Sequence, residues 1–205
     1  MSTPAYQQSI ADSFAPTINV SNLIDVQHTP VYDTVTIAQN GTIDENASLF
    51  FTNVGGGASP TKTLAQTNMT MSQVLPAPEV FSIRALRLRV AETIYRPDFD
   101  TILNQFCLEF WMGTKCYQRG PLWYFPTAGG LTGFSTNFVG DTAYTNGLAS
   151  YESLRPLEIP LVIESMSQFY ARFVGTAYTM TATASGGVGG TFVLLLDGFY
   201  GRRVQ

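Results

Sequence analysis

The chain has 205 residues, of which 45% are hydrophobic and 13% are charged, and its formal net charge is −4. This length suits one domain with one core, the hydrophobic content excludes a disordered chain, and the acidic balance argues against a dedicated nucleic-acid-binding protein. Charged residues are only about half as frequent as in an average soluble domain, which favours a subunit that packs against neighbours.

The positive charge comes from nine arginines and only two lysines, Lys62 and Lys115. Arginine is enriched at protein interfaces because its guanidinium group loses hydration more easily than an ammonium group and pairs in a planar geometry. The bias therefore also favours contacts between subunits.

The first 30 residues are polar, contain three prolines and show no sustained hydrophobic period. We interpret residues 1–30 as an N-terminal arm, followed by a single domain over residues 31–205. The N-terminus lacks the basic and apolar regions of a secretory signal, and no apolar run approaches the ~20 residues that span a bilayer. We therefore expect synthesis in a host cytoplasm.

Alternating hydrophobic and polar residues predict a first strand from Val31 to Ile37, followed by a turn at Asn40-Gly41. In this strand Val31, Val35 and Ile37 share one face. A short aromatic strand is predicted over 49–52. The polar, proline-rich segment 59–78 indicates a long connection.

The clearest strand signal covers residues 79–95. Its hydrophobic residues have odd numbers up to Ile83 and even numbers from Leu86 onward, so the inward face changes near Ala85-Leu86. The simplest explanation is a β-bulge at that point.

Pro97 and Asp98, followed by hydrophobic residues at helical spacing, predict a short helix over 98–105. A strand over 108–112, a hairpin tip at Gly113-Thr114 and a returning strand over 115–118 come next. The aromatic, proline-bounded segment 120–126 is typical of an edge strand or a packed loop.

Residues 127–150 carry no period and indicate a second long loop. Strands are then predicted over 157–163, 169–173 and 178–182, the first at a sheet edge because Pro160 lacks an N–H donor. The last strand, 192–196, is apolar on both faces and fits the centre of a sheet.

Together these eight or nine short strands, one short helix and long loops predict an all-β fold. A single jelly-roll antiparallel β-sandwich has the right size and strand number. An Ig-like β-sandwich is the alternative, disfavoured by the loop lengths and the missing Cys…Trp…Cys spacing.

No catalytic constellation is evident. The only histidine, His28, lies in the arm, where a Ser-His-Asp or Cys-His arrangement is not expected. No zinc-ligand spacing and no phosphate-binding glycine loop occurs. We predict no catalytic, cofactor-binding or metal-binding residues and no enzyme activity; a Glu92–Glu109 pair, as in glycoside hydrolysis, would require adjoining strands.

Cys107 and Cys116 flank the predicted hairpin tip and could face each other if the strands pair. A single pair is no disulfide framework in a chain of this length. We expect buried, reduced thiols.

Two groups of residues are candidates for contacts with partners. A basic patch would meet acidic residues of a neighbouring subunit, packaged nucleic acid or anionic lipid. Aromatic side chains would pack in the core or at an interface, which is the favoured use, or stack on sugars. The basic candidates are Arg84, Arg87, Arg89, Arg202 and Arg203, and the aromatic candidates are Trp111, Trp123, Tyr124 and Phe125.

Three further segments carry a family resemblance. They are Asn68-Met69-Thr70 with Leu75-Pro76 before the Phe81–Val90 strand, Gly113-Thr114-Lys115 with Gly120-Pro121-Leu122, and Leu196-Asp197-Gly198 with Arg202-Arg203-Val204-Gln205. In these segments, from Thr67 onward, the chain resembles the small jelly-roll capsid proteins of tailless icosahedral bacteriophages.

The resemblance implies a virion component, either a major shell subunit or a minor one at a vertex. Its implied partners are copies of itself and other virion proteins, with possible contact to packaged nucleic acid or an internal membrane. The alternatives are a carbohydrate-binding or receptor-binding jelly-roll domain of a virion spike and, less favoured, a glycoside hydrolase.

Overall fold

The structure, a computed structural model, describes residues 23–54, 62–91, 94–126, 132–135, 142–145, 155–182 and 189–203. These residues form one α-helix, α2 (Arg96–Gln105), and one 3-10 helix, η3 (Leu122–Tyr124). The strands are β1 (Leu23–His28), β2 (Val31–Ile37), β3 (Thr42–Ile43), β4 (Ser48–Phe50), β5 (Glu79–Val90), β6 (Phe106–Met112), β7 (Lys115–Pro121), β8 (Thr132–Ser135), β9 (Thr142–Thr145), β10 (Leu161–Ile163), β11 (Phe169–Gly175), β12 (Tyr178–Thr179) and β13 (Gly190–Arg203).

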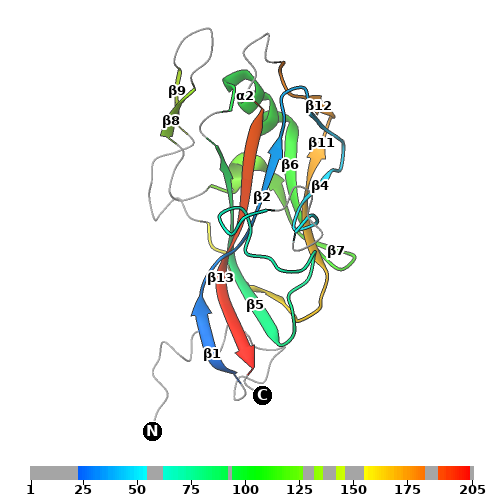
Figure 1. Cartoon of the computed structure of the whole chain (residues 1–205), viewed down its shortest axis with the longest axis vertical. Coiled ribbons are helices and arrows are strands. Elements are labelled where there is room, and N and C mark those ends of the chain that lie inside the picture. The colour runs from blue at the N-terminus through cyan, green and yellow to red at the C-terminus, as the bar shows by residue number, and fades with distance from the viewer. Residues whose placement is uncertain are drawn as a thin grey trace.

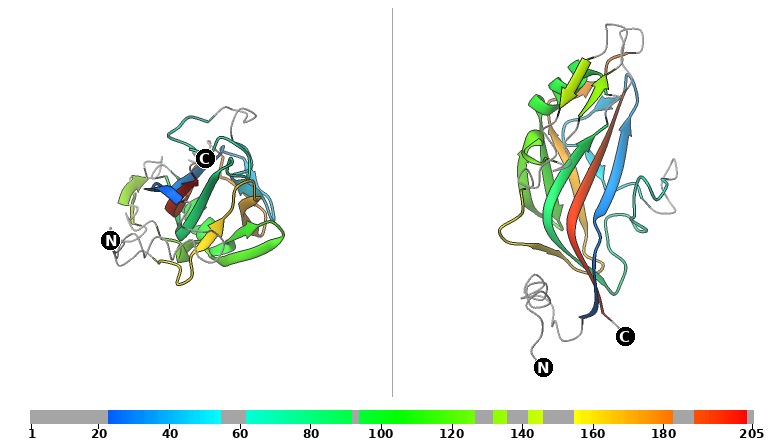
Figure 2. Two further views of the ribbon diagram at one scale, coloured as in Figure 1. Left: turned by 90° about the horizontal axis from the view of Figure 1, so that it is seen from below. Right: turned by 90° about the vertical axis from the view of Figure 1, so that its left-hand side faces the viewer.

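Two antiparallel sheets lie against each other (Figures 1 and 2). The first has the order β1-β13-β5-β10, with β2 also paired to β13, and the second has the order β4-β11-β6-β7. β1 and β2 follow each other along one side of β13, so they act as one interrupted strand. In the right-hand view of Figure 2, red β13 lies between blue β2 and green β5.

This strand order is that of a jelly roll. When β1 with β2 is counted as the first of eight sandwich strands, the sheets have the orders 1-8-3-6 and 2-7-4-5. The first strand thus pairs with the last, and long connections cross between the sheets. The predicted all-β jelly roll is confirmed, whereas an Ig-like sandwich would place its first two strands side by side in one sheet.

The core lies between the two sheets and is rich in phenylalanine. Phe173 on β11 packs against Phe192 on β13 in the opposite sheet, with ring centroids 5.6 Å apart. It also contacts Phe50 and Phe106 of its own sheet, at 5.5 and 6.1 Å. Since strand side chains alternate between faces, every second residue of these strands reaches this layer.

The predicted β-bulge is confirmed on β5. Asp197 lies opposite Ala85 and Gly198 lies opposite Ile83, so Arg84 is the extra residue. The hydrophobic residues on both sides of the bulge, odd-numbered before it and even-numbered after it, join the same core. A Cβ on Gly198 would lie 1.9 Å from the carbonyl oxygen of Ser82, so only glycine fits there.

Helix α2 closes one end of the sandwich and begins at Arg96, two residues before the predicted start. Asp98 lies in the first turn of the helix, as the sequence predicts, and its side chain is buried. It accepts hydrogen bonds from the Tyr178 hydroxyl at 2.7 Å and from the Thr181 backbone N–H at 3.2 Å. This carboxylate therefore fastens the helix to the segment after β12.

The expected arm requires a correction. Its described part contains β1, which pairs with residues 199–203 of β13. The sequence did not indicate this strand, because it is short and lacks clear alternation of hydrophobic and polar residues. The sequence before residue 23 lies outside the described residues.

Several predicted boundaries also differ. The loop expected over 127–150 contains the β8–β9 hairpin, which stands apart from the sandwich in Figure 1. The strand expected over 79–95 ends at Val90, and that over 157–163 is reduced to β10. Among the described strands, β10 pairs with β5 alone, which confirms the edge position, and β13 has neighbours on both sides, which confirms its central one.

Candidate functional site

Three of the predicted arginines project from β5. The Nη2 atom of Arg87 lies 2.5 Å from Oδ2 of Asp197, and Nε2 of His28 lies 3.3 Å from the other oxygen of that carboxylate. The guanidinium group of Arg84 lies 5.9 Å from the centre of the Phe199 ring. Asp197 thus neutralises Arg87, and His28 lies on a strand rather than in an unstructured arm.

The two other arginines lie at the far end of β13. Arg202 lies opposite Glu79, whereas Arg87 lies opposite Leu195. Leu195 and Arg202 are seven positions apart on β13, which corresponds to about 23 Å along the strand. Arg87 and Arg202 therefore occupy distant positions on the sheet, because residues 84–89 pair with the middle of β13.

The aromatic segment after β7 lies beside an open groove of about 670 Å³. The groove is lined by residues of both sheets, of η3 and of the segment 155–161. Trp123 is 61% exposed and Ile159 79% exposed. The guanidinium group of Arg155 lies 4.9 Å from the centre of the Tyr124 ring. We call this region, lined by Tyr124, Arg155 and Ile159 and flanked along the chain by Trp123, the aromatic groove.

Of the two environments expected for Phe125, the core and an interface, the structure shows the core. It is 4% exposed, and its carbonyl oxygen accepts a hydrogen bond from the N–H of Leu88 at 2.9 Å. The chain turns inward after η3, so neighbouring aromatic residues acquire opposite environments.

The outer face of the second sheet holds a cluster that the sequence did not reveal. Leu108 and Phe110, the neighbours of Glu109 on β6, face the core, so Glu109 points to the outer face of the sheet. Its side chain is nevertheless buried, because the residue is only 2% exposed. Its oxygens lie 2.6 Å from Nη2 of Arg119 on β7 and 2.8 Å from Nε of Arg172 on β11. The indole N–H of Trp111 donates a third bond, at 2.8 Å. We call these four residues the Glu109 cluster.

Aromatic contacts complete this cluster. The guanidinium group of Arg172 lies 4.8 Å from the centre of the Trp111 ring, and Trp111 stacks on Tyr170 with the ring planes 4° apart. The ring of Trp111 is thus already engaged by protein groups.

Glu109 does not have the properties of a general acid. Burial raises its pKa, but the hydrogen bonds from Trp111 and Arg172 and the charges of Arg172 and Arg119 outweigh burial and hold the pKa below its ordinary value. Its suggested partner, Glu92, lies outside the described residues. The strand expected to carry Glu92 ends before it, and β5 and β6 belong to different sheets.

Both cysteines are free thiols, and they do not face each other. Cys107 lies opposite Pro121 and Cys116 opposite Trp111 on the paired strands β6 and β7. Both are half-buried rather than buried. Burial, and after it the negative charge of Glu109, raises the pKa of the Cys116 thiol.

A buried ion pair was also missed. Asp33 is completely buried on the inner side of β2, where it accepts hydrogen bonds from the Phe51 N–H at 2.8 Å and from Lys62 Nζ at 2.7 Å. A signal existed, since Asp33 shares the parity of Val31 and Val35 in a strand whose odd-numbered residues face inward. Its partner Lys62, in the long connection, could not be identified from local spacing.

In the described residues, no group of three or more His, Cys, Asp or Glu side chains could hold a metal ion. In the same part of the chain, no helix is long and apolar enough to cross a membrane. Comparison of the chain with models of protein families, with curated proteins and with solved structures gave no match.

Proposed function

We propose that the chain is a structural virion protein, a capsid subunit that assembles with copies of itself into an icosahedral shell. The jelly-roll sandwich, the low charge content and the likeness to tailless bacteriophage capsid proteins support this proposal. The observation that carries it is the aromatic groove, because exposed hydrophobic side chains beside a groove are typical of an interaction site.

The groove has the composition of an interface centre. Tryptophan, tyrosine and arginine are the residues most enriched among energetically dominant contacts. Tyr124 and Arg155 contact each other in the groove, and the exposed Trp123 precedes Tyr124 in the chain. Ile159, which is 79% exposed, adds an aliphatic side chain that water solvates poorly. Removing these side chains from water would stabilise an assembly.

The occupant that fits the groove best is a second copy of the chain. Arg155 and Glu158 are both exposed and lie three positions apart on the same lining segment. In a twofold contact, Arg155 of one copy would meet Glu158 of the other, and each contact would occur twice. Opposite charges at the rim of an apolar patch fix the relative orientation of the partners.

Assembly of the purified full-length chain tests the proposal. We expect light scattering and electron microscopy to show oligomers or shells, and Ile159→Asp to abolish them without changing the circular dichroism spectrum. Leu64→Asp is the matched control, because Leu64 is 76% exposed and does not line the groove. A wild-type chain that stays monomeric at high concentration would falsify the proposal, and an Ile159→Asp chain that still assembles would remove the groove from it.

A second candidate function is a carbohydrate-binding or receptor-binding domain of a virion spike. The exposed ring of Trp123 beside the groove favours it, because sugars stack on such rings. Trp111, the other candidate, already contacts Tyr170 and Arg172. A glycan array would show binding that is lost in Trp123→Ala and retained in Trp111→Phe; the absence of any bound glycan would remove this candidate.

A further inference from the structure

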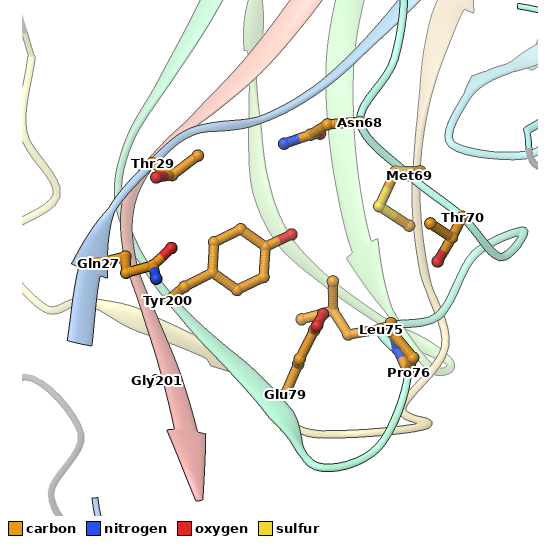
Figure 3. A pocket seen from close by; sticks show the side chains of 10 residues that line it. All are labelled: Gln27, Thr29, Asn68, Met69, Thr70, Leu75, Pro76, Glu79, Tyr200 and Gly201. Atoms are coloured by element: carbon orange, nitrogen blue, oxygen red, sulfur yellow. The ribbon is translucent and has the colours of Figure 1, made fainter. Parts of the chain in front are cut away.

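A cavity of about 250 Å³ lies where the first sheet meets the segment that precedes β5 (Figure 3). It shares no lining residue with the aromatic groove. Glu79 of β5 and Tyr200 of β13 contribute its main polar groups, and Met69 and Leu75 contribute apolar surface. We call it the Glu79 pocket.

The sheet register explains why Glu79 and Tyr200 point into the same space. Tyr200 lies directly opposite Phe81, and their ring centroids are 4.8 Å apart. Glu79 is two residues before Phe81 and therefore lies on the same face of β5. Figure 3 shows the carboxylate of Glu79 and the hydroxyl of Tyr200 both directed into the pocket.

Within the described part of the chain, neither of these two polar groups has a partner for its side chain. The Tyr200 hydroxyl makes no hydrogen bond there, and the Glu79 carboxylate makes no hydrogen bond or ion pair. Burial and, after it, the charge of Glu79 raise the pKa of Tyr200, so its hydroxyl keeps its proton and can donate. Half-buried polar groups without partners are available to a ligand.

Hydrogen bonds of Asn68 hold the rim of the pocket in place. The side chain of Asn68 accepts a hydrogen bond from the Tyr32 N–H at 3.0 Å and donates one to the Pro30 carbonyl at 2.8 Å. These bonds hold the segment before β5 against β2 and leave Asn68 with one unused N–H. Thr29 and Thr70 add hydroxyl groups to the lining.

We propose that the Glu79 pocket binds a small polyhydroxylated ligand of the size of a monosaccharide. A carboxylate only accepts hydrogen bonds, whereas the Tyr200 hydroxyl both donates and accepts. Adjacent hydroxyl groups of one ligand can donate to Glu79 and accept from Tyr200 at the same time. The C–H groups of such a ligand would lie on Leu75 and Met69, which are 1% and 5% exposed.

Titration calorimetry with the full-length chain tests the pocket, with D-glucose, D-galactose, D-mannose, N-acetyl-D-glucosamine and myo-inositol as probes. We expect at least one probe to bind in a saturable way. Glu79→Gln and Tyr200→Phe should each weaken that binding about tenfold, the effect of one lost hydrogen bond to a buried polar group. Tyr200→Phe keeps the ring contact with Phe81, and Thr70→Val tests the rim without touching the core.

Leu64→Ala is the matched control, because Leu64 is 76% exposed and lines neither the pocket nor the aromatic groove, so the affinity should be unchanged. Absence of saturable binding by every probe would overturn the proposal. So would binding that is equally strong in Glu79→Gln, Tyr200→Phe and Thr70→Val. The Glu79 pocket and the aromatic groove are separate, so the result of this titration does not bear on the capsid proposal, which the assembly experiment tests.

Discussion

Arg172 on β11 lies directly opposite Glu109 on β6, and its Nε atom donates a hydrogen bond to Glu109 Oε2 over 2.8 Å. Glu109 is almost inaccessible to solvent, whereas Arg119, its other ionic partner, has a side chain that is 65% exposed. Arg172 is therefore the main shielded counter-charge of this carboxylate and links the two central strands of the second sheet.

Removal of Arg172 should destabilise the fold. Arg172→Met leaves a buried carboxylate with one exposed partner, and we expect a loss of about 3 kcal/mol in the free energy of unfolding. Urea denaturation measures it. The double variant Glu109→Gln/Arg172→Met should recover part of the loss. The control is Arg96→Met: Arg96 forms an exposed ion pair with Asp100 at 3.6 Å, so its removal should change stability by less than about 0.5 kcal/mol. Equal losses in the two arginine variants would contradict this account.

Glu109 should also contribute to acid sensitivity. Its pKa is lowered in the folded state, so its stabilising effect is complete above the ordinary carboxyl range, about 4.3, and is lost as the pH falls through the lower folded value. Urea midpoints measured from about pH 6 to about pH 3 should fall less steeply in Glu109→Gln than in the wild type. Glu164→Gln, at an exposed position, should keep the wild-type slope; identical slopes in all three proteins would argue against the effect.

The Asp33–Lys62 pair offers a comparison between the only two lysines. Lys62→Met should cost about 3 kcal/mol, because Asp33 is fully buried and would lose its counter-charge. Lys115→Met, at an exposed position, should cost about 0.5 kcal/mol or less. Thermal or urea unfolding provides the measurement, and Asp33→Asn should partly rescue Lys62→Met. The account would be wrong if both lysine variants had the same stability.

The close approach of β13 to β5 at the bulge should make Gly198 intolerant of a side chain. Gly198→Ala places a methyl group against the Ser82 carbonyl and should cost about 3 kcal/mol by forcing the strands apart. Gly113→Ala serves as the control, because φ at Gly113 is +57° and nothing lies within 4 Å of its Cβ position, so only the backbone cost of about 1 kcal/mol applies. A smaller loss for Gly198→Ala than for Gly113→Ala, in the same urea assay, would reject the bulge geometry.

The thiol of Cys116 should react slowly. Its raised pKa and its half-buried position both reduce the amount of accessible thiolate at about pH 8. In a Cys107→Ser chain, where Cys116 is the only thiol, alkylation by iodoacetamide should be at least about tenfold slower in the folded state than in urea. A folded-state rate equal to the rate in urea would show that the environment of Cys116 is not protective.

Much of the fold could be predicted because its signals are local. Period-2 alternation marks β2, and a run that is apolar on both faces marks β13. The change of parity near Ala85 marks the bulge, and Gly113-Thr114 marks the β6–β7 hairpin. These patterns depend on the pleat and on turn geometry, which act over a few residues. β1 and the β8–β9 hairpin were missed because short strands without clear alternation carry no such signal.

The candidate sites depended on contacts between distant residues. The sequence suggested that Arg87 and Arg202 share a patch, but the strand register places them far apart. Arg87 instead forms an ion pair with Asp197, which is 110 residues away in the sequence. Glu109 and Arg172 are 63 residues apart, and their pairing follows from the order of strands in the second sheet. Such pairs cannot be derived from spacing, because each depends on which strands become neighbours.

From its amino-acid pattern alone, then, the chain specifies a low-charge, all-β fold, and local backbone and side-chain preferences are sufficient for that conclusion. The partners of its charged groups were settled only when the two sheets were paired and stacked. The same is true of Tyr200, which ordinary alternation places on a strand face and which becomes part of a pocket only where β13, β5 and the segment before β5 converge. Burial and long-range register are properties of the assembled sandwich. They determine which partners and environments residues of the same type acquire, and the sequence alone does not show this.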